Sequence, residues 1–159
     1  MKIILLSGSV GSGKTTALAK AASGDGLVGG ILQPKGANGR ELIDIATGEG
    51  ERLEQLEAGE REVAVGRYVF RQAAFDWAND RLAGVTRPVV LIDEVGPLEL
   101  RDGGLHEGVA AVLRGAARLV VIAVREALTE AVRGRYAPGA ESVALVGWPQ
   151  YWQSVRGAL

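Results

Sequence analysis

The residues best suited to chemistry in this sequence form a glycine-rich loop near its start. Residues 8–15 read Gly-Ser-Val-Gly-Ser-Gly-Lys-Thr, the G-x-x-x-x-G-K-T pattern of phosphate-binding loops. Gly8, Gly11 and Gly13 permit backbone angles that a side chain would forbid, so successive N–H groups can turn inward around an anion. Lys14 adds a positive charge that can reach terminal phosphates, and the Thr15 hydroxyl can ligate a magnesium ion.

The segments on either side of this loop support the same interpretation. Residues 2–7 form an apolar run typical of a buried parallel strand, and residues 16–22 are strong helix formers. The order of strand, loop and helix places a helix N-terminus against the phosphates. We therefore predict that the nucleotide is bound by Gly8, Ser9, Val10, Gly11, Ser12, Gly13, Lys14, Thr15 and Thr16.

A second reactive stretch lies in the middle of the chain. Residues 89–92 are four apolar residues that predict a central buried strand, and Asp93 and Glu94 follow at its C-terminal end. Ligands of open α/β sheets bind at that end of the strands, so Asp93 is expected near Thr15 and a bound magnesium ion. Glu94 could then polarise a water for in-line attack on the terminal phosphate. The alternative is an acidic strand end that merely meets solvent.

A third strand, over residues 118–124, ends in Arg125. An arginine at a strand end on the ligand side could stabilise charge on the transferring phosphate. It could equally form a surface ion pair, and the sequence leaves these two roles open.

The remaining elements follow from periodicity and turn signals. We expect a short strand over residues 27–32, a hairpin turn at Asn38-Gly39 and a returning strand over 41–46. A strand over 63–70 should lead into a helix whose apolar stripe runs from Phe70 to Leu82. Further helices are expected over 105–116, after Leu128 and from Trp148, with a last strand over 142–146.

Length and composition limit the classes of protein that fit. The chain has 159 residues, the size of one domain spanning 1–159, and a net charge of −1 without a basic block. Nucleic-acid binding is therefore not expected, and the absence of cysteine excludes disulfides and cysteine metal sites. No apolar run is long enough to span a bilayer, and the chain begins with a core strand. We expect a cytoplasmic protein without membrane contact, for which a monomer is plausible and the oligomeric state is unknown.

Together these motifs resemble the cancer-related nucleoside-triphosphatase family, which has thermophile and animal members. The resemblance covers nearly the whole chain, including residues 8–16, Asn38-Gly39 and Val65-Gly66-Arg67-Tyr68-Val69. Its most discriminating part is residues 93–100, Asp-Glu-Val-Gly-Pro-Leu-Glu-Leu, which is similar to that family's Asp-Glu-Ile-Gly-Lys-Met-Glu-Leu signature.

The resemblance implies a single-domain, three-layer α/β fold of the P-loop NTPase class, with a RecA-like, mostly parallel sheet extended by antiparallel strands. It also implies slow, magnesium-dependent hydrolysis of nucleoside triphosphates with broad base tolerance. Lys14 and Thr15 carry over as phosphate and magnesium groups, Asp93 as the magnesium-side acid and Glu94 as the base. Pro97 stands where many relatives have lysine, and residues 31–35 lack the threonine and glutamate familiar in relatives.

Two other functions fit a phosphate-binding core. A nucleotide or small-molecule kinase would need an acceptor pocket and an arginine-rich lid, for which Arg133 and Arg135 are the candidates. A nucleotide-binding switch would bind tightly without turnover. Free phosphate, a phosphorylated acceptor, or binding alone would distinguish the three.

Overall fold

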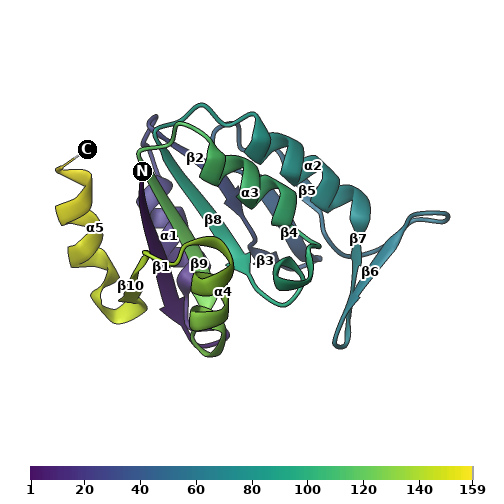
Figure 1. Ribbon diagram of the computed structural model, residues 1–159. Helices are drawn as coiled ribbons and strands as arrows, with labels where there is room; N and C mark the ends of the chain where they lie inside the picture. Colours follow the sequence, from purple (N-terminus) through teal and green to yellow (C-terminus); the bar gives the residue numbers. More distant parts are fainter. Residues whose placement is uncertain (159) are drawn as a thin grey trace.

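The computed structural model describes residues 1–158 and is built around one mixed sheet. The strand order is β10-β1-β9-β8-β2-β4-β3, with β5 paired to β4. The strands β10, β1, β9, β8 and β2 run parallel to their neighbours. Strand β4 pairs antiparallel with β2, β3 and β5. This is the mostly parallel α/β sheet with an antiparallel extension that the sequence predicts. Figure 1 shows α2, α3 and α4 in front of the sheet and α1 behind it.

The strands of the sheet are β1 (Lys2–Gly8), β2 (Val28–Leu32), β3 (Lys35–Gly36), β4 (Gly39–Asp44), β5 (Gly50–Arg52), β8 (Val89–Val95), β9 (Leu119–Arg125) and β10 (Glu141–Ala144). The helices are α1 (Lys14–Ala22), α2 (Gln72–Ala83), α3 (His106–Arg114), α4 (Thr129–Tyr136) and α5 (Trp148–Arg156). Short 3-10 turns η1 (Glu99–Arg101), η2 (Glu126–Leu128) and η3 (Leu145–Gly147) connect them.

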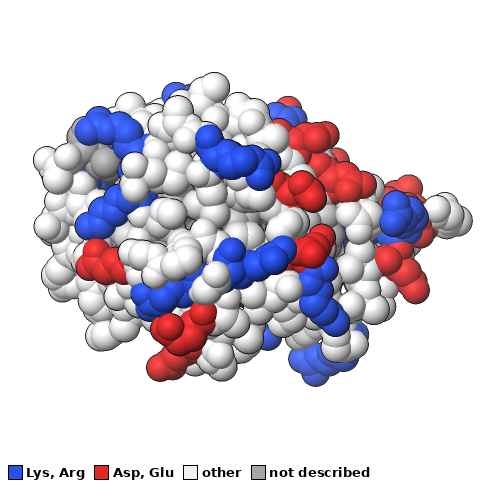
Figure 2. Space-filling view, viewed as in Figure 1, with Lys and Arg blue, Asp and Glu red and all other residues white. Residues whose placement is uncertain are grey.

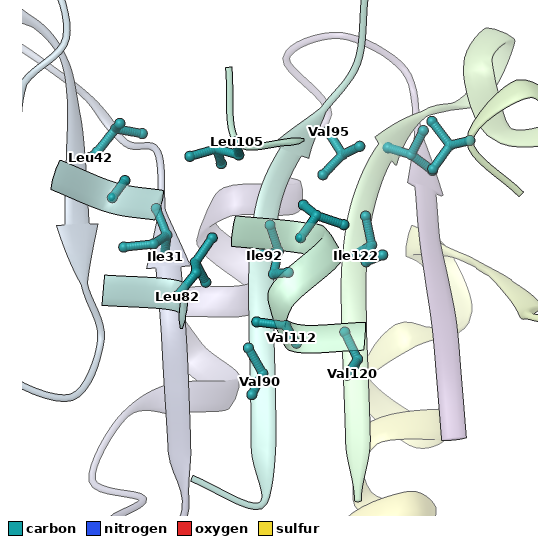
Figure 3. Packing of buried hydrophobic residues seen from close by; sticks show 14 of the residues in the cluster. Ile31, Leu42, Leu82, Val90, Ile92, Val95, Leu105, Val112, Val120 and Ile122 are labelled. Carbon is teal, nitrogen blue, oxygen red and sulfur yellow. The ribbon is translucent and has the colours of Figure 1, made fainter. Parts of the chain in front are cut away.

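Alternation along the central strands divides the core into two layers. On β8, Val90 and Ile92 face the cluster under α2 and α3, whereas Val89 and Leu91 face the cluster under α1 and α5. β9 alternates in the same way, and its residues 119–124 are all buried. Because both faces are covered, these strands read as continuous apolar runs in the sequence. Figure 3 shows the α2/α3 layer, including Leu82, Val112, Ile92 and Ile122.

The segment over residues 62–71 differs from the sequence prediction of a single strand. It forms a separate hairpin of β6 (Glu62–Val65) and β7 (Tyr68–Arg71), which projects beside the sheet (Figure 1). Val65 pairs with Tyr68 across a two-residue turn, and Gly66 at its first position has φ 57°. A glycine at positive φ in that position suits a hairpin turn. Phe70 consequently belongs to β7, and α2 begins only at Gln72.

The turn at Asn38-Gly39 also differs by one residue. Gly36 pairs with Gly39, so Ala37 and Asn38 are the two turn residues, and Gly39, at φ 101°, already belongs to β4.

Gly30 on β2 leaves no room for a side chain beside the backbone of β8, and we expect alanine there to be strongly destabilising. Gly30 has φ 119°, and a Cβ atom would lie 1.9 Å from the carbonyl oxygen of Leu91 on β8. Since the backbone must move, Gly30→Ala should cost more than about 3 kcal/mol of unfolding free energy. Urea unfolding would measure this loss of unfolding free energy. Gly134→Ala is the control, because Gly134 lies in α4 with open space around it and alanine favours helix. Equal stability of the two variants would contradict the steric argument.

Candidate active site

The glycine-rich loop joins β1 to α1 and encloses the Lys14 ammonium group. Gly13 is the N-cap residue of α1 and has φ 101°, a conformation that glycine adopts without strain. Because glycine has no side chain to cap the helix, the N–H groups of the first turn remain available to an anion. The Lys14 side chain is buried, and its Nζ donates to the carbonyl oxygens of Gly8 at 3.0 Å and Ser9 at 2.9 Å. The loop therefore holds a positive charge at a helix N-terminus.

Asp93 lies buried at the C-terminal end of β8. Its Oδ2 accepts a hydrogen bond from the Gln33 N–H at 3.0 Å, and its Oδ1 is buried without a hydrogen-bond partner among residues 1–158. Desolvation raises the pKa of Asp93 to about 6, although the nearby Thr15 side chain and the hydrogen bond from the Gln33 N–H oppose the rise. The Thr15 hydroxyl and the Asp93 carboxylate are thus neighbours, as the sequence predicts.

This pair of oxygen ligands suits a magnesium ion. Mg²⁺ binds oxygen donors, keeps several waters and commonly takes one or two carboxylates plus substrate phosphates. A buried carboxylate oxygen without a partner, next to a threonine hydroxyl, fits that chemistry. Within the described part of the chain, no group of three or more His, Cys, Asp or Glu side chains is arranged to hold a metal.

The raised pKa of Asp93 has a consequence for stability in the absence of metal. The folded pKa of about 6 exceeds the ordinary value of 3.8, so folding favours the protonated form. Stability from this group is present at low pH and is lost as pH rises from about 4 through 6. Asp93→Asn should therefore be more stable than the parent by on the order of 2 kcal/mol at pH 8, with a gap that closes toward pH 4.

Urea unfolding at several pH values without divalent metal would measure this difference. Asp80→Asn, at an exposed carboxylate on α2, is the control for the same substitution without burial. A destabilised Asp93→Asn protein at pH 8 would show that ionised Asp93 is better compensated than its burial indicates.

Glu94 sits in an irregular part of β8. The pairing of β8 with β9 shifts register between Ile92 and Val95, and Glu94 has φ 60°. A residue other than glycine is strained by roughly 1–2 kcal/mol at positive φ. Such strained residues and β-bulges are frequent next to active sites. The bulge turns the partly exposed Glu94 side chain into the adjoining cleft while Asp93 remains buried.

Arg125 lies at the end of β9, between the loop and the acidic pair. β9 is inserted between β1 and β8, and Arg125 pairs in register with Gly8 at the first residue of the glycine-rich loop. Its Nε lies 3.9 Å from Oε2 of Glu94. The sequence left open whether Arg125 stabilises phosphate charge or forms an ion pair. The two roles are compatible, because the ion pair with Glu94 lies within the cleft.

A cleft of about 540 Å³ brings these groups together, and we refer to it as the main cleft. Its wall includes the loop residues 10–16, Glu94 and Arg125. Gly8, Ser9 and Asp93 do not form part of that wall. The rest of the wall is formed by residues that the sequence analysis did not assign to a site, namely Gln33, Pro34, Lys35, Arg40, Val65, Tyr68, Phe70, Phe75, Gly96, Pro97, Leu98 and Glu99.

Glu99 shapes the rim of this cleft. Its carboxylate is buried and accepts the N–H groups of Gly96 at 2.8 Å and Leu105 at 2.9 Å. Burial raises the pKa of Glu99, and the two hydrogen bonds oppose the rise. Gly104 (φ 56°) allows the close fit, since a Cβ there would lie 2.2 Å from Oε1. The sequence showed only a glutamate between two leucines. In the structure, Glu99 holds the loop that follows β8.

Aromatic and basic side chains from the two hairpins form the far end of the main cleft. The Arg40 guanidinium lies 4.4 Å from the Tyr68 ring centroid and forms a 2.9 Å ion pair with Glu54. The hydrogen bond from Arg67, followed by the nearby Arg40 guanidinium, lowers the pKa of Tyr68 to about 8. Tyr68 and the two guanidinium groups thus form a cluster. The sequence carried no signal for it, because the two hairpins meet only in the tertiary structure.

The single histidine and two of the tryptophans pack against neighbouring side chains. His106 Nδ1 lies 2.7 Å from the Tyr136 hydroxyl, which donates to the carbonyl oxygen of Glu99. Trp148 is buried and stacks with Trp152 at a centroid distance of 5.3 Å. These contacts give His106, Trp148 and Trp152 packing roles. Across residues 1–158, no helix combines the length and apolarity that crossing a membrane requires.

Comparison with known proteins places the chain in a family. The family NTPase_1, described as NTPase, matches residues 3–143. The chain is 33% identical over 138 residues to the nucleoside-triphosphatase THEP1 of Methanothermobacter thermautotrophicus, covering 79% of this chain and 78% of that protein. It is 30% identical over 130 residues to the nucleoside-triphosphatase THEP1 of Saccharolobus solfataricus, covering 75% and 74%.

The fold is similar to a solved structure over almost its whole length. The crystal structure of THEP1 from the hyperthermophile Aquifex aeolicus superimposes with a TM-score of 0.71 at 22% identity, covering 98% of this chain and 96% of that one. The family match and the curated relatives agree with the predicted resemblance. The chain therefore belongs to the NTPase_1 family and is a nucleoside-triphosphatase with the α/β P-loop fold.

Proposed function

We propose that this protein hydrolyses ATP, GTP and other nucleoside triphosphates to the diphosphate and phosphate, by attack of water on the γ-phosphate. The observation that carries the proposal is the meeting of Lys14, Glu94 and Arg125 in the main cleft, above the buried Asp93. Glu94 and Arg125 lie at the C-terminal ends of β8 and β9, and Lys14 begins the helix after the loop that follows β1, at the edge where α/β sheets bind ligands.

The glycine-rich loop has the features of a triphosphate cradle. The N–H groups at the start of α1 and the Lys14 ammonium would bind the phosphate oxygens. Asp93 and Thr15 would hold the magnesium ion, which neutralises phosphate charge when bound. The buried Asp93 Oδ1 is the local feature that supports this assignment.

Glu94 and Arg125 are suited to the hydrolytic step. Glu94 would accept a proton from the attacking water as the new oxygen–phosphorus bond forms and the bond to the β,γ-bridging oxygen breaks. Arg125, 3.9 Å from the Glu94 carboxylate, would both orient that base and face charge that develops on the phosphate.

The kinase alternative receives no support from the arginines proposed as a lid. Arg133 donates to the carbonyl oxygen of Ala140 and, at 2.6 Å, to Ser142 Oγ, whereas Arg135 bonds Asp102. Both guanidinium groups are thus engaged in holding α4 to its neighbours.

Phosphate release from ATP, GTP, CTP and UTP with magnesium would test the proposal. We expect release from each of them, and none when EDTA removes the metal. A phosphorylated acceptor in place of free phosphate would support a kinase, and saturable binding without turnover would support a switch.

Arg125→Ala should lower turnover by roughly tenfold to a hundredfold while triphosphate affinity changes by less than about threefold. The reason is that Arg125 contacts the base at the strand end and lies outside the loop that binds the phosphates. Steady-state turnover and equilibrium binding of a non-hydrolysable analogue would separate the two quantities. Arg118→Ala, an exposed arginine just before the opposite end of β9, is the matched control. Unchanged turnover in Arg125→Ala would reduce Arg125 to a structural ion-pair partner.

A further inference from the structure

A second groove adjoins the main cleft. This side groove, of about 590 Å³, shares Val65, Tyr68, Pro97 and Arg125 with the main cleft. The rest of its wall comes from the β6–β7 turn, η1 and η2. No residue of the glycine-rich loop lines it. A molecule in the side groove could therefore contact Arg125 without contacting the phosphate cradle.

The floor of the side groove is apolar. Val65, Pro97, Leu100 and Leu128 contribute aliphatic surface from four separate segments of the chain. All four are only partly buried, although Leu100, Val65 and Leu128 pack at the edge of the main core. Such a surface can bind the hydrocarbon part of a small ligand, and its volume is in the range of small-molecule sites.

The charged groups of the side groove are all of one sign. Arg67, Arg101 and Arg125 line it, and no aspartate or glutamate does. Among the ion pairs formed within residues 1–158, none includes Arg67 or Arg101. Figure 2 shows basic side chains gathered on this face between α4 and the β6–β7 hairpin. Acidic side chains gather more densely above them, on the side of α2 and β5.

Hydrogen bonds within the protein orient the two unpaired guanidinium groups. Arg67 Nη2 donates to the Tyr68 hydroxyl at 3.0 Å, and Arg101 Nε donates to the carbonyl oxygen of Pro97 at 3.2 Å. Each bond uses one nitrogen and leaves further N–H groups of the same guanidinium free to donate. An arginine fork of this kind matches the geometry of a phosphate or carboxylate.

We propose that the side groove is a binding site for a second ligand, a small organic anion. Its phosphate or carboxylate group is held by Arg67 and Arg101, and its apolar body lies on Val65, Leu100 and Leu128. The occupant differs from the triphosphate group that the glycine-rich loop would bind, because no residue of that loop lines the side groove. The site reaches the hydrolytic centre through Arg125, which belongs to both cavities.

Phenyl phosphate is a suitable probe, since it joins an apolar ring to a dianion. With the glycine-rich loop filled by magnesium and a non-hydrolysable triphosphate, we expect saturable one-to-one binding of phenyl phosphate by calorimetry, weakened by about tenfold in each of Arg67→Gln and Arg101→Gln. Arg114→Gln, at an exposed arginine on α3 that lines neither cavity, should bind as the parent does. Benzoate in place of phenyl phosphate distinguishes a carboxylate-binding site from a phosphate-binding one, and neutral benzyl alcohol should not bind.

Lys14→Ala separates the side groove from the glycine-rich loop. It should retain phenyl phosphate binding and lose triphosphate binding, whereas Arg67→Gln and Arg101→Gln should show the reverse. NMR offers a test without any substitution. Titration of the parent protein with phenyl phosphate should shift the arginine Nε–H resonances of Arg67 and Arg101. Absence of saturable binding would overturn the proposal, as would binding that is lost in Lys14→Ala and kept in both arginine variants. Neither result bears on triphosphate hydrolysis, which is measured separately by phosphate release.

Discussion

Replacing Lys14 with alanine is expected to weaken triphosphate binding by roughly a hundredfold or more, and to abolish phosphate release at ordinary substrate concentrations. The Lys14 side chain is buried inside the glycine-rich loop, where its Nζ is held by the carbonyl oxygens of Gly8 and Ser9. It is the mobile positive charge of the cradle, and charge-assisted bonds to phosphate contribute about 1.5–3 kcal/mol each.

Equilibrium binding of a non-hydrolysable triphosphate would measure the loss. Lys20→Ala is the matched control, because Lys20 lies on the same helix, is exposed and is remote from the loop. Thermal melts of both variants would show whether removal of the buried ammonium also alters folding. Binding that survives in Lys14→Ala would mean that the backbone N–H groups alone suffice to hold the triphosphate.

Replacing Glu94 with glutamine should lower turnover by about a hundredfold to ten-thousandfold while leaving triphosphate binding intact. Glutamine has the same shape but cannot accept the proton of the attacking water. It also keeps the strained φ of 60° in a side chain of equal size, so the bulge of β8 should persist. The expected protein binds its substrate and stalls before hydrolysis.

Single-turnover phosphate release, measured beside analogue binding, would separate chemistry from affinity. Glu107→Gln, an exposed glutamate on α3, serves as the control for loss of a carboxylate. Turnover at the parental rate in Glu94→Gln would exclude Glu94 as the base. In that case Arg125 would lose its proposed positioning role, while the cradle formed by Lys14 and the loop would be unaffected.

Local features of the fold could be predicted because they depend on neighbours in the sequence. The order of apolar run, glycine-rich loop and helix formers located β1 and α1, and continuous apolar runs located β8 and β9. The prediction of a single strand over 63–70 was wrong. Four residues there, Val63, Val65, Tyr68 and Phe70, favour strands, and only Gly66 marks the turn between β6 and β7. A single glycine does not distinguish a turn from a bulge.

Site residues could be predicted from the sequence only where they belong to a recognisable motif. Lys14, Thr15, Asp93 and Glu94 could be named from residue type and spacing. The burial of Glu99, the approach of Arg40 to Tyr68 and the side groove could not, because each depends on segments far apart in the chain. Pro97 illustrates the difference, since its sequence position marked only a departure from relatives, whereas the structure places it on both cavities.

By itself, the sequence determined the cradle, the acidic strand end and the layered α/β class, because glycine conformations, helix propensity and hydrophobic periodicity act over a few residues. Only the tertiary structure decided that β9 lies between β1 and β8, which sets Arg125 beside both Gly8 and Glu94. It also decided that Asp93 is buried while Glu94 turns outward on a bulge. Strand order and register depend on pairing between distant segments, and no local pattern encodes which strand will lie next to which.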